Sequence, residues 1–201
     1  MKKKRRKEII IGLDEVGRGA LAGPVVAVAV KIKKNELKLK KIENYQKNIL
    51  SFNDSKKFNP NKRKEIFQEI IKEPFIEWGI GLVYQKKIDK INILEATKVA
   101  MVKALKKIDY FDFKIIIDGN FKIELDCCQE SLIKADEKIL ECSIASIIAK
   151  VKRDQIMENY HKKYPHYDFD KNKGYGTKNH IKAIKNYGLS PLHRKSFKIK
   201  S

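Results

Sequence analysis

The feature that most constrains this chain is an apolar run that ends on two adjacent carboxylates. Residues 9–13 read Ile-Ile-Ile-Gly-Leu, Asp14 and Glu15 follow, and a Gly-Arg-Gly turn (17–19) leads into a second apolar run at 25–32. Both runs are typical of buried strands. Carboxylates at the end of a buried strand are costly unless a partner such as a divalent cation neutralises them. The alternative is that Asp14 and Glu15 mark a solvated loop, where most charged residues lie.

Two further apolar runs lead to a carboxylate. Ile115–Ile117 is followed by Asp118, and Leu132–Ile133 leads to Asp136. Sites in α/β sheets form where strands end, so we expect both carboxylates to meet the first pair at one edge of a sheet. Four such carboxylates would hold two Mg²⁺ or Mn²⁺ ions about 4 Å apart, an arrangement suited to in-line phosphodiester hydrolysis.

Each of these assignments has a simpler alternative. Asp118 precedes Gly-Asn, a common turn context, and Asp136 could be a surface residue near a helix start. Adjacent residues of a strand also point to opposite faces. Asp14 and Glu15 can therefore share a site only if the strand bends there, which the glycines on either side would permit.

The chain is strongly basic. Its 201 residues suffice for one domain with a core, and the formal net charge is +20. Nucleic acid is the default partner of such a surface, although a lysine-rich proteome would give the same excess. We expect a log–log salt slope of binding near −5 if about six phosphates are contacted.

The cysteines and the hydropathy pattern bear on the compartment. The three cysteines, Cys127, Cys128 and Cys142, form a poor disulfide framework and lack zinc-site spacing. We expect packing roles for them, and packing or phosphate-contact roles for the four histidines. No signal-peptide core or run of about 20 apolar residues is present. A cytoplasmic protein with no membrane contact is expected.

The remaining pattern predicts a mixed α/β layer structure. Asn59-Pro60 begins a helix that ends near Pro74, and Asp89 caps a long helix. Further strands are expected at 75–84 and 121–127, helices at 141–160 and 178–187, and loops at 33–50 and 164–175.

Several segments, in order along the chain, resemble ribonuclease HII. They run from about residue 9 to 197, and together they are far more specific than any one of them. The segments include Asp-Glu-Val-Gly-Arg-Gly at 14–19, Asn-Asp-Ser-Lys-Lys at 53–57, Asp-Gly-Asn at 118–120, Lys-Ala-Asp at 134–136, Gly-Tyr-Gly-Thr at 174–177 and His-Arg-Lys-Ser-Phe at 193–197.

The resemblance implies a fold, a reaction and a set of catalytic residues. The fold would be the ribonuclease H-like α/β fold, with a mixed central sheet flanked by helices and a short helical C-terminal extension. The catalytic and metal-binding residues would be Asp14, Glu15, Asp118 and Asp136. The reaction would cut the RNA strand of RNA–DNA hybrids, and single ribonucleotides in duplex DNA, leaving 5′-phosphate and 3′-hydroxyl ends.

The resemblance also implies substrate contacts. Gly17, Arg18 and Gly19 match the family's reader of the ribose 2′-hydroxyl, and Tyr175 matches its tyrosine at the RNA–DNA junction. The 2′-hydroxyl is what separates RNA from DNA, and a glycine turn can present backbone groups to it closely. Candidate phosphate contacts are Asn53, Lys56, Ser146 and Lys150, which could equally be turn, packing and surface residues.

Two rival functions stay open. A non-catalytic nucleic-acid-binding module explains the charge but not the acidic strand ends, and a junction resolvase shares the carboxylates without needing a ribose. We expect a monomer with a basic arm at 1–7, a catalytic domain at 8–176 and an extension at 177–201 packed on that domain.

Overall fold

The fold is built on one mixed sheet. The computed structural model describes residues 9–33, 39–50, 59–109 and 113–199. The strand order is β3-β2-β1-β4-β5: β1 pairs antiparallel with β2 and parallel with β4, β2 pairs antiparallel with β3, and β4 pairs parallel with β5. The strands are β1 Ile9–Val16, β2 Val25–Ile32, β3 Ile76–Val83, β4 Phe113–Asp118 and β5 Cys128–Leu132.

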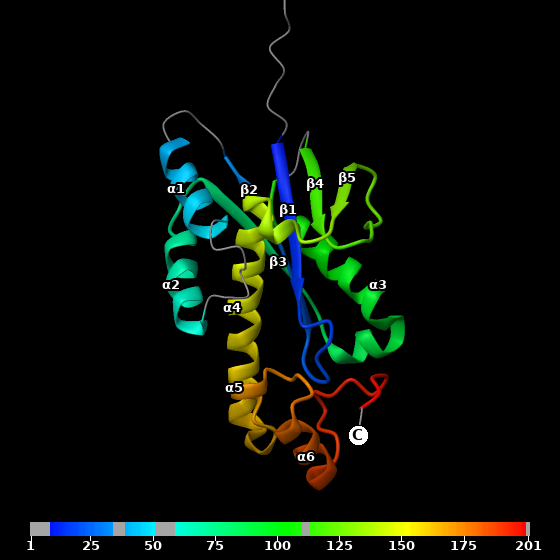
Figure 1. The fold of residues 1–201 in the computed structure, drawn as a ribbon. Helices are drawn as coiled ribbons and strands as arrows, with labels where there is room; N and C mark the ends of the chain where they lie inside the picture. The colour runs from blue at the N-terminus through cyan, green and yellow to red at the C-terminus, as the bar shows by residue number, and fades with distance from the viewer. Residues whose placement is uncertain (1–8, 34–38, 51–58, 110–112, 200–201) are drawn as a thin grey trace, which may run out of the picture.

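Helices cover both faces of the sheet (Figure 1). One face packs against α4 with α1 and α2 beside it, and the other packs against α3. This arrangement confirms the predicted fold class. The helices are α1 Leu39–Leu50, α2 Pro60–Ile70, α3 Gln85–Leu105, α4 Leu140–Lys163, α5 Phe169–Asn172 and α6 Lys178–Tyr187, with 3₁₀ turns η2 Ala135–Glu137 and η3 Pro165–Tyr167.

The central strand β1 has two different faces. Ile11 and Leu13 are fully buried in the cluster with α3. Gly12 faces α4, where an added Cβ would collide with the backbone nitrogen of Cys142. This glycine therefore lets α4 lie directly on the strand, and it does not end or bend β1, which continues to Val16.

The C-terminal segments pack around the lower end of α4 (Figure 1). Met157 of α4, Phe169 of α5 and Ile184 of α6 share a cluster with Ala22 of the β1–β2 connection. Thr177 caps α6 through its side chain by accepting from the His180 amide at 3.3 Å. The division into a domain at 8–176 and an extension at 177–201 stays a prediction.

Three expectations about secondary structure are wrong. Part of the expected loop at 33–50 is helix α1, because Ile42, Tyr45 and Ile49 recur at helical spacing and pack towards the α4 cluster. The expected strand at 121–127 is irregular, and β5 begins only at Cys128. The expected loop at 164–175 contains η3 and α5.

The long helix begins differently from the prediction. Asp89 does not cap α3, which starts at Gln85 and breaks at Asn92, a residue with φ +65°. The Asn92 side chain accepts from the Leu94 and Glu95 amides and so caps the second part of the helix. The Asp89 carboxylate instead accepts from the Ser196 amide and hydroxyl. None of the described helices is long and apolar enough to cross a membrane.

Candidate active site

Three of the four predicted carboxylates meet at one edge of the sheet. Asp14 in β1, Asp118 at the end of β4 and Asp136 in η2 each offer an oxygen within 4.8 Å of the others. Asp14 and Asp136 are both only 7% exposed. Oxygen-only donors at this spacing suit a hard divalent cation. The catalytic role of these residues stays a prediction.

Backbone pairing explains how distant segments converge. Leu13 of β1 pairs with Ile117 of β4 in parallel register, which places the two following aspartates side by side. The Asp118 carboxylate then accepts from the Ala135 amide at 3.0 Å. Lys134 turns the chain with φ +58°, so that η2 presents Asp136 to the same place.

The Asp14 carboxylate lies in an electrostatically unfavourable environment. Burial raises its pKa well above the usual value, and the neighbouring charges of Glu15 and Asp118 raise it further. The hydrogen bond from Ser146 and the charge of Lys150, both on α4, oppose this shift in pKa. Lys150 itself donates to the Ser146 hydroxyl at 2.8 Å. The site therefore concentrates negative charge that a divalent cation would neutralise.

Glu15 lies beside this cluster but outside the set of mutually close oxygens. Its Oε1 is 3.2 Å from Nη1 of Arg18, whereas Oε2 is buried and accepts no hydrogen bond from any residue that the structure describes. Burial raises the pKa of Glu15, and Arg18 partly offsets the rise. A buried carboxylate oxygen without a donor is what a cation-binding group leaves in a structure without ions.

The Gly17–Gly19 turn lies directly after this strand. Gly17 has φ +91°, and an added Cβ would collide with the Arg153 guanidinium. Gly19 is exposed, and a Cβ there would meet no atom within 4 Å. The Arg18 side chain is 39% exposed and stacks over Phe121 at 5.4 Å while it pairs with Glu15. The turn is thus fixed at Gly17 and open at Gly19.

Two buried arginines that were assigned no role from sequence hold this turn. Arg153 of α4 donates to the carbonyls of Pro24, Ala22 and Lys173 at 2.7–3.1 Å. Arg194 donates to the carbonyls of Gly23 and Arg18. Burial lowers the pKa of both guanidinium groups. Their targets are backbone oxygens, which leave no residue pattern in a sequence.

Tyr175 lies close to the same turn. Its side chain is half-exposed, and its ring lies over the Arg153 guanidinium at 5.3 Å. The preceding carbonyl, that of Gly174, accepts from the Leu21 and Ala22 amides. The structure therefore joins Tyr175 to the β1–β2 connection.

The structure places two of the four candidate phosphate contacts. Ser146 is almost fully buried and Lys150 is half-buried, both next to Asp14. Asn53 and Lys56 lie outside the described residues. A role in phosphate binding stays a prediction for all four.

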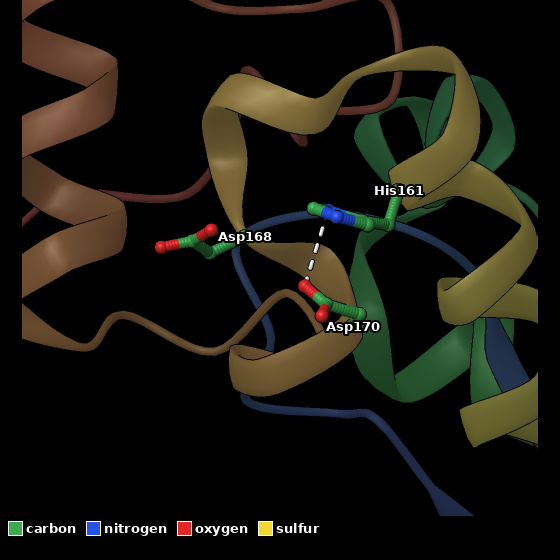
Figure 2. Close-up of side chains that lie close together, drawn as sticks. All are labelled: His161, Asp168 and Asp170. Carbon is green, nitrogen blue, oxygen red and sulfur yellow. Dashed lines mark ion pairs between the residues drawn. The ribbon is translucent and has the colours of Figure 1, made fainter.

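The positions of the histidines and cysteines agree only in part with the packing roles expected for them. His161 shows no metal spacing in the sequence, yet its ring lies beside Asp168 and Asp170, with its Nδ1 3.1 Å from Asp170 (Figure 2). All three side chains are partly exposed. The cysteines are free: Cys142 is buried, as a packing role requires, Cys127 is half-buried, and Cys128 is exposed.

The fold and the acidic cluster together define a class of protein. Ribonuclease H2 of Pyrococcus horikoshii OT3 has a similar structure, with a TM-score of 0.73 and 27% sequence identity, covering 95% of this chain and 94% of that one. A mixed five-stranded sheet of this topology, with carboxylates gathered beside its parallel strands, places the protein among the ribonuclease H-like nucleases.

Sequence comparison then gives the family. The family model for ribonuclease HII matches residues 11–200. The ribonuclease HII of Clostridioides difficile (strain 630) is 46% identical over 186 residues, 92% of this chain and 68% of the relative. That of Lactobacillus helveticus (strain DPC 4571) is 44% identical over 193 residues, 96% and 72% of the two chains. The chain belongs to the ribonuclease HII family.

Proposed function

We propose that this nuclease cuts the RNA strand of RNA–DNA hybrids and also cuts at single ribonucleotides in duplex DNA, leaving 5′-phosphate and 3′-hydroxyl ends. The observation that carries the proposal is the meeting of Asp14, Asp118 and Asp136 beside the Gly17–Gly19 turn. An acidic cluster supplies hydrolysis, and a glycine turn next to it supplies a means to recognise ribose.

Asp14, Glu15, Asp118 and Asp136 would hold two divalent ions, Mg²⁺ or Mn²⁺. Such ions, when bound, activate water and stabilise the leaving oxygen of the phosphodiester. The donor set fits this assignment because it is all oxygen, and because burial, together with the charges of Glu15 and Asp118, raises the pKa of Asp14, an effect that a bound cation would oppose.

The protein's own residues orient this centre. Ser146 and Lys150 keep Asp14 turned towards α4, and the Ala135 amide fixes one oxygen of Asp118. Arg18 holds one oxygen of Glu15 and leaves the other directed into the buried space. Preorganised ligands of this kind avoid the cost of rearrangement during the reaction.

Recognition of ribose would come from the turn and from Tyr175. The space beside Gly19 is open where a Cβ would lie, so a sugar can approach the backbone there. The half-exposed Tyr175 ring, supported beneath by Arg153, offers a flat surface for the sugar of the next nucleotide. A deoxyribose stacks closely, whereas a 2′-hydroxyl would hinder the contact.

A cleavage assay with three duplexes tests the proposal. The substrates are an RNA–DNA hybrid, a DNA duplex with one ribonucleotide and an all-DNA duplex of the same sequence, each with Mg²⁺, Mn²⁺ or EDTA. We expect metal-dependent cutting of the first two only, with product ends mapped by ligation and phosphatase treatment. Equal cutting of all-DNA duplex would favour a resolvase-like activity, and binding without cutting would favour a non-catalytic module.

We also propose a monomer acting in the cytoplasm, without membrane contact. Three free cysteines, one of them exposed, support a reducing compartment. Sedimentation of the purified chain at micromolar concentration tests the oligomeric state.

A further inference from the structure

Two buried histidines face each other behind Tyr175. His180 of α6 and His193 of the following segment are 0% and 2% exposed, and their Nε2 atoms lie 3.0 Å apart. The rings of Tyr167 and Phe169 surround the pair at centroid distances of 5.0–6.4 Å. Among the described residues, no carboxylate forms an ion pair with either imidazole. The proposed reaction uses neither ring.

The hydrogen-bond partners fix where each proton lies. Nδ1 of His180 is 2.9 Å from the Tyr175 carbonyl oxygen, which can only accept, so this nitrogen carries a hydrogen. Nδ1 of His193 accepts from the Ser190 amide at 2.9 Å, so this nitrogen is bare. His193 therefore donates from Nε2 to the bare Nε2 of His180.

The result is a directed chain of donors from Ser190 to Tyr175. Both rings are neutral. A second proton on His180 would set two N–H groups against each other across 3.0 Å, and a second proton on His193 would face the Ser190 amide N–H at 2.9 Å. The chain ends on the backbone of Tyr175, whose ring is half-exposed beside Arg153. The Arg153 guanidinium supports the ring from one side, and the backbone that carries the ring sets where it lies above that guanidinium.

We propose that the neutral His180–His193 pair is a positioning device that sets the Tyr175 ring for a substrate whose ribonucleotide is followed by a deoxyribonucleotide. This inference rests on the proposed role of Tyr175. His180 acts through the Tyr175 carbonyl, and His193 acts by keeping the His180 tautomer that donates to it.

Two substitutions of His180 distinguish an effect on the position of Tyr175 from an effect on the stability of the protein. In His180→Asn the amide nitrogen takes the place of Nδ1 and still donates to the Tyr175 carbonyl, but the His193 donor loses its acceptor. In His180→Gln the longer amide reaches His193 and accepts from it, but the donor to Tyr175 is lost. The Tyr175 carbonyl keeps a bond from the Thr177 amide at 2.8 Å. The Asn variant, with an unsatisfied buried donor, should thus be the less stable one.

The inference predicts that the less stable variant is the more active. On a duplex with one ribonucleotide, we expect kcat/KM to fall about 10–100-fold in His180→Gln and to stay within about threefold in His180→Asn. In a Tyr175→Ala background the two variants should not differ. His166→Gln, a change at an exposed ring stacked on Tyr187, is the matched control and should have no effect.

A second measurement reports the position of the Tyr175 ring independently of enzyme activity. The chain is labelled with 3-fluorotyrosine, and the Tyr175 fluorine resonance is assigned by Tyr175→Phe among the eight tyrosines. This resonance should move in His180→Gln and stay in place in His180→Asn. If wild-type protein fails to cut the ribonucleotide duplex while the resonances behave as expected, the proposed function fails and the positioning stands. If the two variants agree in both measurements, the positioning role is overturned.

Discussion

Replacing Asp14 by Asn should stabilise the metal-free protein while it abolishes cleavage. The substitution keeps the shape of a side chain that is 7% exposed and removes only its charge. Two carboxylates at the 4.8 Å limit repel each other by about 3 kcal/mol at an effective dielectric of 20, and by about 1 kcal/mol in water. Burial, the largest cause of the raised pKa of Asp14, adds to the penalty.

The gain is opposed by the loss of favourable contacts. Lys150 attracts the carboxylate, and Ser146 donates a hydrogen bond to it. The net stabilisation should therefore be on the order of 1–3 kcal/mol, or about 1 M in the urea midpoint. Cleavage should fall more than about 100-fold, because loss of a proposed metal ligand should cost more than loss of a residue that only orients a ligand.

The assay is urea unfolding in EDTA and in Mg²⁺. Wild-type protein should gain stability from Mg²⁺ by mass action, and the variant should gain much less. Asp126→Asn, at an exposed carboxylate, is the control and should shift stability by less than about 0.5 kcal/mol. An Asp14→Asn variant that is less stable than wild type in EDTA would refute the argument from charge repulsion.

Three further predictions concern the turn, the buried imidazoles and the basic surface. Gly17→Ala should destabilise the fold by more than about 1–2 kcal/mol. Gly19→Ala should unfold like wild type but lose ribonucleotide cleavage. Equal unfolding midpoints for the two variants would contradict the turn geometry. Burial and His180 lower the pKa of His193 to about 4, so stability should be full above about pH 6.5 and fall by about 3 kcal/mol towards pH 4. Urea midpoints across this range should flatten in His193→Gln, and an unchanged slope would count against the neutral pair. Duplex binding should weaken with a log–log salt slope near −5, and a flat titration would remove the argument from the +20 charge.

The sequence predicted the strands and helices that carry strong periodicity. The runs that became β2 and β4 and the helix around Ile144 are long or uniformly apolar, so local pattern suffices. Helix α1 was missed because Ile42, Tyr45 and Ile49, which mark its buried face, are spread through a lysine-rich segment. Asp89 was assigned to a cap because a capping residue and a partner for a distant segment look the same in sequence.

The site was predictable in part. Asp14, Asp118 and Asp136 each come after an apolar run, which is a local signal. The parallel pairing of β1 with β4 brings Asp14 and Asp118 together, whereas Asp136 is brought in by the left-handed turn at Lys134. Two features were not predictable, because they depend on distances between elements. Glu15 lies apart from the three aspartates, and Arg153 donates hydrogen bonds to backbone carbonyls. The two glycines expected to bend β1 instead admit α4 and Arg153.

The pairing of β1 with β4 has a consequence for how the molecule forms. Ile11 and Ile115 are partners, so more than a hundred residues must be synthesised before the central strand gains its parallel neighbour. Closing so long a loop is slow compared with forming a helix. A ribosome-bound chain that has exposed only β1–β3 would carry Asp14 in an unfinished sheet, and the acidic cluster can form only after β4 and η2 have emerged.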